Sequence, residues 1–410
     1  MELDVENSDS TLNSLSLKSI LTLRYDPTQQ PILQKLKWND FTQKYEIPIS
    51  TIENSITKNI INSVENSEPK KISISLSGGI DSSIVLLFLK KVFPNSKIKA
   101  ISVKFSDSID ETSRAKNIAN NFDVDQEVLF IENYLEKLPQ AINVSKLPFW
   151  DIHWYYVAEK AKNFSNYLAS GDGGDELFGG YVFRYSKFLS LIKPNSTPIE
   201  KAQAYIQCHE RDHVQDQDSI FGPKSNFDWS DIYHLLLPHF DNLLSPLEQV
   251  FLADYNGKLL YNFSILNKKI IDSFGIKPII PLLSNEMISH SIHMNIKEKY
   301  DVSQNIGKLP LRKILEKNNM LKFFDDQKLG FSVNTINLWN NYGHEICKQY
   351  LSDSRMVQDG WLNKNWILKH IDRKDLDVRY VNKFLGLLSF EIWYRMFVTS
   401  EFNPKTTLGN

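Results

Sequence analysis

The residues most able to do chemistry are Ser-Gly-Gly-Ile-Asp-Ser at positions 77–82. The two glycines let the backbone turn sharply and approach a ligand, and a following helix would point N–H groups at phosphate oxygens. An acidic residue in such an anion site makes sense if Asp81 holds a cation, namely Mg²⁺ on pyrophosphate. A Walker loop would need Gly-Lys-Ser/Thr and a dinucleotide fingerprint a third glycine, and neither is present. The simpler alternative is a Gly-Gly turn with an Asp-Ser helix cap.

A second run, Ser-Gly-Asp-Gly-Gly-Asp-Glu-Leu-Phe-Gly-Gly-Tyr, occupies positions 170–181. Its acids Asp172, Asp175 and Glu176 would repel one another unless a cation or a substrate amine joins them. The run follows a predicted strand, and parallel sheets bind ligands at the carboxyl ends of their strands. A surface Asp-Gly turn is the simpler alternative. It is disfavoured because the phosphate-type loop at 77–82 lies two predicted strands upstream in the same strand–helix alternation.

The elements that must position both runs alternate between strand and helix. We expect strands at 72–76, 97–105, 126–131 and 166–170, and helices at 49–64, 82–89, 110–122, 132–143 and within 146–165. This alternation predicts an α/β fold with a parallel sheet covered on both faces. Residues 1–48 are predicted to form a partly disordered arm or linker, in which 17–45 form a small ribbon or a packing arm. Residues 49–192 are predicted to form the α/β core, and 193–410 a mainly helical region that completes the synthetase domain and the substrate pocket.

Composition narrows the class of protein without naming an activity. The chain has 410 residues, 42% of them hydrophobic and 23% charged, and a formal net charge of −2, which argues against a nucleic-acid partner held by general electrostatics. Cys208 and Cys347 make no disulfide or metal pattern, and the histidines have no zinc spacing. No signal-peptide pattern and no run of about 18 apolar residues is present, so we expect a cytoplasmic protein without membrane spans.

Together with two later motifs, the two runs resemble the synthetase domain of the asparagine synthetase family. The later motifs are Lys-Leu-Pro-Leu-Arg at 308–312 and Lys-Leu-Gly-Phe at 328–331, and the similarity extends over about residues 50–400. The resemblance implies a pyrophosphate-loop fold, like that of adenine nucleotide alpha-hydrolases and Rossmann-like proteins. It also implies an ATP-dependent ligase that forms AMP.

The implied reaction joins AMP to a carboxylate, aspartate in the family, with release of pyrophosphate, and then transfers ammonia to form the amide. The resemblance assigns catalysis to Lys308, Asp172, Asp81 and Asp175, and Mg²⁺ binding to Asp81 and Asp175. It assigns ATP binding to Leu76, Ser77, Gly78, Gly79, Asp81, Ser82, Ser83, Val103, Gly171 and Lys328, and substrate contact to Asp172 and Glu176.

The sequence also departs from the family's pattern. Positions 277–284, Lys-Pro-Ile-Ile-Pro-Leu-Leu-Ser, keep Pro281 of the family's Glu-x-Arg-x-Pro-Phe-Leu-Asp but lack both acids and the arginine. The preceding Asp-Arg-x-x-Met pattern is absent around Lys268 and Lys269. Glutamine-using members carry an N-terminal glutaminase whose catalytic cysteine follows the initiator methionine, whereas Glu2 stands there in this chain. We therefore expect free ammonia, or a separate glutaminase subunit, to supply nitrogen.

Three classes of function stay open. The first is the asparagine synthetase-like ligase, whose substrates would be an aspartate-like carboxylate and ammonia or another amine. Such a ligase could also form a homodimer. The second is a family relative that joins another carboxylate to an amine other than ammonia, as ring-closing synthetases do, and the departure at 277–284 keeps it open. The third is a non-catalytic binding or scaffold protein, which Asp81, Asp175 and Lys308 disfavour. Transfer-RNA thiolases, which also use the first loop, would need paired cysteines and a basic surface.

Overall fold

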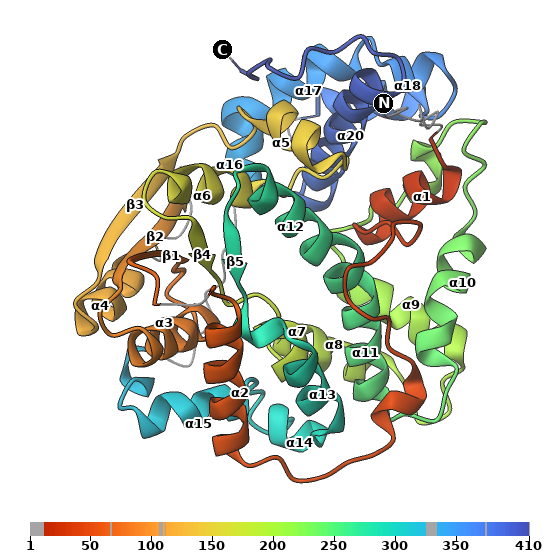
Figure 1. Cartoon of the computed structure of the whole chain (residues 1–410). Coiled ribbons are helices and arrows are strands. Elements are labelled where there is room, and N and C mark those ends of the chain that lie inside the picture. The colour runs from red at the N-terminus through yellow and green to blue at the C-terminus, as the bar shows by residue number, and fades with distance from the viewer. Residues whose placement is uncertain are drawn as a thin grey trace, which may run out of the picture.

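A five-stranded parallel sheet lies at the centre of the phosphate-loop region (Figure 1). The computed structural model describes residues 12–65, 68–105, 110, 112–324, 334–373 and 375–409. The strand order is β3-β2-β1-β4-β5, and every neighbouring pair is parallel. The strands are β1 (Lys71–Ser75), β2 (Lys97–Phe105), β3 (Asp125–Ile131), β4 (Tyr167–Ala169) and β5 (Lys277–Ile279). The predicted parallel α/β sheet is confirmed.

The fifth strand comes from far along the chain and was not predicted. β5 has three residues, one of them Pro278, and a proline lowers the strand signal of a sequence. It occupies the edge of the sheet, where a missing backbone N–H is tolerated. β5 therefore joins the predicted helical region to the predicted α/β core, and the predicted boundary near residue 192 stays a prediction.

Both faces of the sheet are covered, as is usual for a parallel sheet. Along β2, Ile98 and Ala100 belong to one buried cluster, and Ile101, Val103 and Phe105 belong to the other. The helix α2 (Ile49–Asn62) precedes β1, and the helices between β1 and β4 are α3 (Ile80–Val92), α4 (Thr112–Asn121), α5 (Leu138–Ser145) and α6 (His153–Lys162). α5 begins six residues later than predicted, because the segment before it forms turns in which the Asn133 side chain accepts from the N–H of Leu135.

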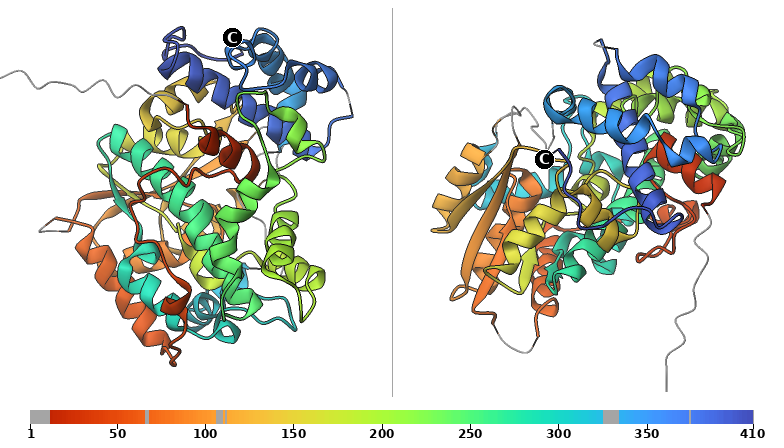
Figure 2. Two further views of the ribbon diagram at one scale, coloured as in Figure 1. Left: turned by 90° about the vertical axis from the view of Figure 1, so that its right-hand side faces the viewer. Right: turned by 90° about the horizontal axis from the view of Figure 1, so that it is seen from above.

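The second half of the chain is mainly helical, as predicted. α5, α17 and α20 lie together at one end of the molecule, where the C-terminal segment also lies (Figure 2). The helices are α7 (Gly174–Phe178), α8 (Val182–Leu191), α9 (Pro198–Cys208), α10 (Trp229–Phe240), α11 (Pro246–Asp254), a π-helical segment η3 (Tyr255–Phe263), α12 (Ser264–Ser273), α13 (Asn285–His293), α14 (Ile296–Lys299), α15 (Leu309–Lys317), α16 (Thr335–Leu338), α17 (His344–Leu351), α18 (Arg355–Gln358), α19 (Lys364–Ile371) and α20 (Val378–Phe397).

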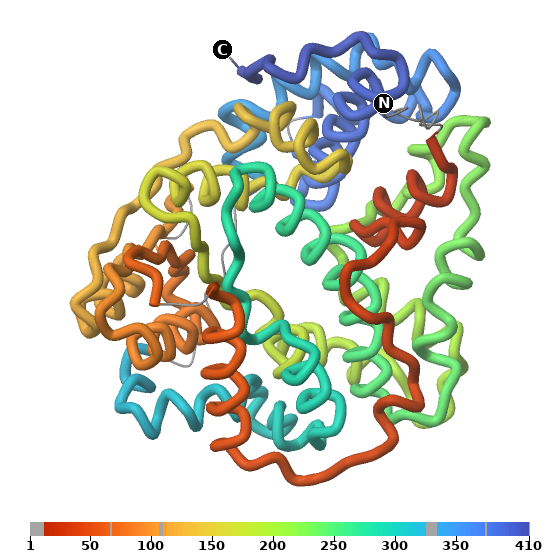
Figure 3. Tube along the Cα trace, in the orientation of Figure 1, coloured from red at the N-terminus to blue at the C-terminus, as the bar shows by residue number. Residues whose placement is uncertain are grey.

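The N-terminal arm contains a helix, so of the two predicted forms, a small ribbon or a packing arm, the structure agrees with the packing arm. α1 (Ser14–Leu23) buries Leu17 completely and contacts α10 and α20. Arg24 closes the helix in a left-handed conformation, and the chain then runs along one side of the molecule to α2 (Figure 3). The arm is therefore packed onto helices from the end of the chain.

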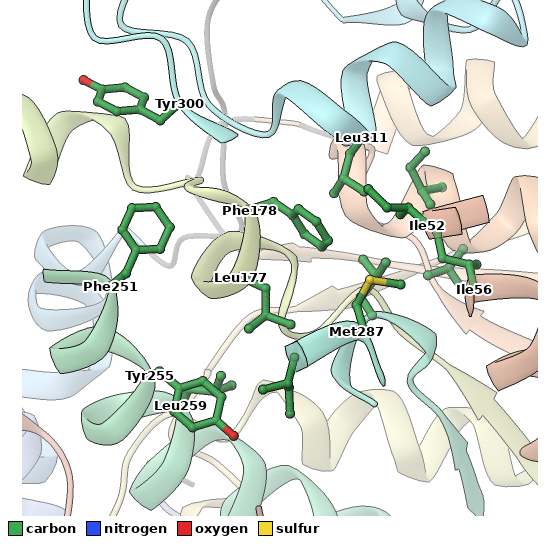
Figure 4. Close-up of a cluster of buried hydrophobic side chains, with 14 of the residues drawn as sticks. Ile52, Ile56, Leu177, Phe178, Phe251, Tyr255, Leu259, Met287, Tyr300 and Leu311 are labelled. Carbon is green, nitrogen blue, oxygen red and sulfur yellow. The ribbon is translucent and has the colours of Figure 1, made fainter. Parts of the chain in front are cut away.

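A buried cluster fixes the short helix of the second run. Leu177 and Phe178 of α7 lie among Ile52 of α2, Met287 of α13 and Leu311 of α15 (Figure 4). Because these partners come from helices distant in sequence, the cluster sets the position of the acids at the start of α7. In the part of the chain that the structure describes, no helix is long and apolar enough to cross a membrane.

Candidate active site

The first loop joins the end of β1 to the start of α3. Leu76 continues the strand, since its N–H donates to the carbonyl of Ile101 (2.9 Å) and its carbonyl accepts from the Ser102 hydroxyl (2.7 Å). Gly78 has φ of 78°, a conformation that favours glycine. Gly79 is the N-cap of α3, and its carbonyl accepts from the Ser83 hydroxyl (2.7 Å). The predicted strand, sharp turn and helix start are thus present.

The second loop lies directly against the first. It follows β4, and the N–H of Ser170 donates to the carbonyl of Ile279 in β5 (3.0 Å). A Cβ on Gly171 would lie 2.6 Å from the backbone carbon of Asp81, and one on Gly174 would overlap the Asp81 carboxylate. Two glycines therefore let the loops touch at Asp81, a reason that the sequence alone did not supply.

Lys308 brings a positive charge to this junction. Its ammonium is ion-paired with Asp81 and lies 2.8 Å from an oxygen of Asp175. The residue precedes α15 with a left-handed φ of 57°, and its N–H donates to the carbonyl of Phe178 (2.8 Å). Burial alone would lower the pKa of Lys308, but the carboxylates of Asp175 and Asp81 outweigh it and raise that pKa. The amine is therefore fully charged at neutral pH.

Asp172 has the properties of a weak base rather than those of a fixed anion. Burial, with a smaller contribution from the charge of Asp81, raises the pKa of Asp172 to about 6. Asn267 of α12 donates to its carboxylate at 3.0 Å, which opposes that rise by stabilising the charged form. Asp172 thus titrates closer to neutral pH than an ordinary aspartate does.

Glu176 is buried, with 6% of its surface exposed, and accepts a hydrogen bond from the hydroxyl of Tyr181. Burial and the neighbouring charge of Asp175 raise the pKa of Glu176 to about 7. Beyond it, Arg184 pairs with Asp254 (2.9 Å). These contacts make Glu176 a support for the loop, and its predicted contact with substrate stays a prediction.

The structure brings together part of the predicted set. Asp81, Asp175 and Lys308 meet, Gly171 touches Asp81, and Ser77, Ser82 and Ser83 surround the turn of the first loop. Val103 lies buried toward the carboxyl end of β2, the neighbour of β1. Lys328 lies outside the described residues.

Sequence reasoning missed two residues that contact the second loop. Asn267 donates to Asp172, and the side chain of Leu283 would touch a Cβ placed on Gly173, at 2.9 Å. Both residues lie in or next to the stretches in which the sequence departs from the family's pattern. Those departures were the only hint in the sequence to these two contacts, because the segments that depart from the family's pattern are the ones that pack on the loop of Asp172.

The two carboxylates of Asp81 and Asp175 fit a cation. Their oxygens converge on one positive centre, the ammonium of Lys308, and carboxylate oxygens are the ligands that Mg²⁺ prefers. Among the described residues, no group of three or more His, Cys, Asp or Glu side chains could hold a metal ion alone. A cation here would therefore need further oxygens from a ligand, as Mg²⁺ obtains from phosphates.

The parallel sheet, the loop after β1 and the helical second half define the class of pyrophosphate-loop α/β proteins. Residues 64–395, more than half of the chain, match the family described as asparagine synthase, and the chain belongs to that family.

Two relatives and two solved structures complete the comparison. The glutamine-hydrolyzing asparagine synthetase 1 of Bacillus subtilis (strain 168) is 22% identical over 399 residues, which cover 87% of this chain and 62% of that protein. A putative glutamine-hydrolyzing asparagine synthetase 2 of Methanocaldococcus jannaschii is 36% identical over 142 residues, 31% of this chain and 27% of that protein. The chain thus spans less than two thirds of either relative. Similar solved structures include an NH3-dependent NAD synthetase from Campylobacter jejuni, which has 15% sequence identity and a TM-score of 0.26; the match covers 49% of this chain and 99% of that chain. They also include an NMN synthetase from Francisella tularensis, which has 13% sequence identity and a TM-score of 0.29; the match covers 52% of this chain and 94% of that chain.

Proposed function

We propose that the chain is an ATP-dependent ligase that adenylates a carboxylate, aspartate in the first instance, and transfers ammonia to form the amide and AMP. The observation that carries the proposal is the meeting of Asp81, Asp175 and Lys308 beside a phosphate-type loop at the carboxyl end of β1. Membership of the asparagine synthase family supports it.

The chemistry needs activation, because a carboxylate would have to expel oxide to react with an amine. Attack of the carboxylate oxygen on the α-phosphate of ATP breaks the bond to pyrophosphate, and the amine then displaces AMP from the mixed anhydride. The backbone N–H groups of the first loop would bind phosphate oxygens. Mg²⁺, held by Asp81 and Asp175, would neutralise charge on pyrophosphate.

Lys308 would act in both the adenylation and the displacement of AMP, and Asp172 would act when the amine attacks. The ammonium of Lys308 is compact and charged, so it can follow the negative charge that develops on the α-phosphate and the acyl oxygen. Asp172, with its raised pKa, would take a proton from the attacking amine. Asn267 would hold that carboxyl group toward the reacting centre.

A second candidate keeps the adenylation and changes the acceptor. It is favoured by one contact: Leu283, in the stretch that lacks the family's acids and arginine, packs on Gly173 beside Asp172. An altered pocket at this place would suit an amine other than ammonia.

The exchange of labelled pyrophosphate into ATP tests the proposal. The purified chain, with Mg²⁺ and a panel of carboxylic acids, should exchange label only when both metal and a suitable acid are present. Subsequent trials with ammonium and with organic amines separate the two candidates. Exchange that needs no carboxylate, or no exchange with any acid, would contradict adenylation.

A further inference from the structure

A cavity of about 290 Å³ adjoins the candidate active site. Asn267 lines it and also donates to Asp172, so the cavity begins one side chain from the proposed base. Phe105, the last residue of β2, lines it as well, which places it at the carboxyl edge of the sheet. By the same measure, a single water needs roughly 10–15 Å³. The space therefore exceeds what ammonia requires.

Positive charge dominates the polar lining of this cavity. Arg24 pairs with Asp151 and lies 3.4 Å from an oxygen of Asp212, and Lys258 also pairs with Asp212. Burial would raise the pKa of Asp212, but Lys258 and Arg24 outweigh it and hold that pKa below its usual range. Arg24 and Lys258 are thus held in place by acids, and their charges are largely balanced.

Arg211 adds a charge that is not balanced in this way. It is exposed, it lines the cavity, and its guanidinium forms no hydrogen bond or ion pair with any residue in the described ranges. The adjacent Glu210 is paired with Lys187 (2.5 Å). Burial lowers the pKa of His153, another lining residue, to about 4, so its ring is neutral at pH 7. The hydrogen bond from Lys187 is the main cause of the lowered pKa of Glu210, and the charge of Arg211 contributes less. Within the part of the chain that the structure describes, one guanidinium without a hydrogen-bond or ion-pair partner therefore lines the cavity.

The walls are aromatic as well as cationic. Trp150 stacks under Arg24, whose guanidinium carbon lies 5.0 Å from the ring centroid, and Tyr134 and Phe263 also line the space. Such a lining suits a small organic molecule with an apolar stem and an anionic end, because an arginine binds a carboxylate through two parallel hydrogen bonds.

We propose that this cavity binds an organic substrate through a free carboxylate that does not react, with Arg211 as its anchor. The inference rests on the proposed adenylation and names the substrate class for that site. The carboxylate could belong to a dicarboxylic acid that is adenylated at its other end, or to an amine acceptor of amino-acid type. In either case, Arg211 holds the anionic end while the reactive group lies beside Asp172.

Binding to the full chain without ATP tests the site independently of catalysis. Calorimetric titrations would use C3 to C6 dicarboxylic acids, the protein amino acids, and their matched amides, such as succinate against succinamate and glycine against glycinamide. At least one acid should bind at least about tenfold more tightly than its amide. Arg211→Gln should remove that difference and Arg211→Lys should keep part of it. Arg373→Gln, at a half-buried arginine that pairs with Asp375 and does not line the cavity, is the control.

Exchange and amide formation then identify the source of the carboxylate. If the adenylated acid carries it, Arg211→Gln raises the KM for that acid in pyrophosphate exchange without an amine. If the acceptor carries it, exchange is unchanged, and only the KM for the acceptor rises. Absence of exchange in the wild type, with Arg211-dependent binding intact, would refute the adenylation alone. If Arg211→Gln changes neither the affinity for the acid nor any KM, Arg211 is not the anchor, and the proposed function still stands.

Discussion

At the scale of single residues, the position of Lys308 between two carboxylates distinguishes its role from that of an ordinary nucleotide contact. A charge that acts mainly on the transition state should lower kcat more than it weakens ground-state binding. We expect Lys308→Ala to reduce turnover at least about a hundredfold, equivalent to ~2.7 kcal/mol, with nucleotide affinity nearly unchanged. Rate and nucleotide affinity measured on the same preparation decide this, with Lys313→Ala on the exposed side of α15 as control. Equal losses in both quantities would make Lys308 a nucleotide anchor.

Asp81 and Asp175 are expected to act through the cation they hold. Replacement of either by Asn keeps the shape but removes the charge, so pyrophosphate exchange should fall at least about a hundredfold. A plot of exchange rate against Mg²⁺ concentration should also shift to higher concentration. Asp272→Asn, at an exposed acid of α12 paired with Lys268, should behave as the wild type. Normal exchange and normal Mg²⁺ dependence in both variants would refute the metal assignment.

The raised pKa of Asp172 predicts the pH dependence of the second step. A base must be deprotonated, so amide formation should fall below pH 6, the value to which burial raises its pKa, and should drop about tenfold per unit on the acid side. The partial exchange reaction needs no base and should lack this limb. Measuring both rates from pH 5 to 8 separates the two steps. Asp172→Asn should abolish the limb, whereas Glu176→Gln, at the acid with a pKa of about 7, should retain it. A limb that survives in Asp172→Asn would assign the base elsewhere.

At the scale of elements, close contact between loops makes a steric prediction. A Cβ on Gly180 would overlap the Asp175 carboxylate and lie 2.6 Å from Cε of Lys308. Gly180→Ala should therefore displace both charged groups and lower pyrophosphate exchange at least about tenfold. Gly386→Ala, in the interior of α20, is the matched control, because its Cβ would meet the side chain of Leu21 in α1 at 3.5 Å, an ordinary van der Waals contact. It should gain about 0.5–1 kcal/mol in free energy of unfolding by urea, with exchange unchanged.

The strands and the contacts between the loops could be predicted from the sequence to different extents. β1 to β4 follow from β-branched, apolar segments and the alternation with helices, but the three residues of β5 carry no such pattern. The resemblance grouped Asp81, Asp175 and Lys308, and it could not give the ion pairs, because Lys308 reaches the site from the start of α15 by way of packing between α7 and α15. Arg24 and Asn267 were missed because nothing in their local sequence shows which distant side chains they contact, although Asn267 lies next to a departure from the family's pattern.

At the scale of the whole molecule, the nitrogen donor can be predicted from the cysteines. Burial raises the pKa of Cys208 to about 12, and that of Cys347 still further above its usual value. Glutamine hydrolysis by a thiol needs an accessible thiolate, and these are the chain's two cysteines. We expect the purified chain to form amide with ammonium or an organic amine and to release no glutamate from glutamine, measured by assays of glutamate and amide. Glutamate release would contradict this, and rescue of glutamine use by a cell extract would support a separate glutaminase subunit.

The packing of α1 on α20, and the late arrival of β5 at the edge of the sheet, carry a consequence for synthesis on the ribosome. β4 leaves the ribosome long before residues 277–279 can pair with it, so its backbone edge is open in the nascent chain. α1 likewise emerges before both helices that it contacts, α10 and α20. The chain must therefore keep the apolar face of α1 and an unpaired strand edge from aggregating until these later elements have been translated, which makes chaperone dependence during translation an expected property of this molecule.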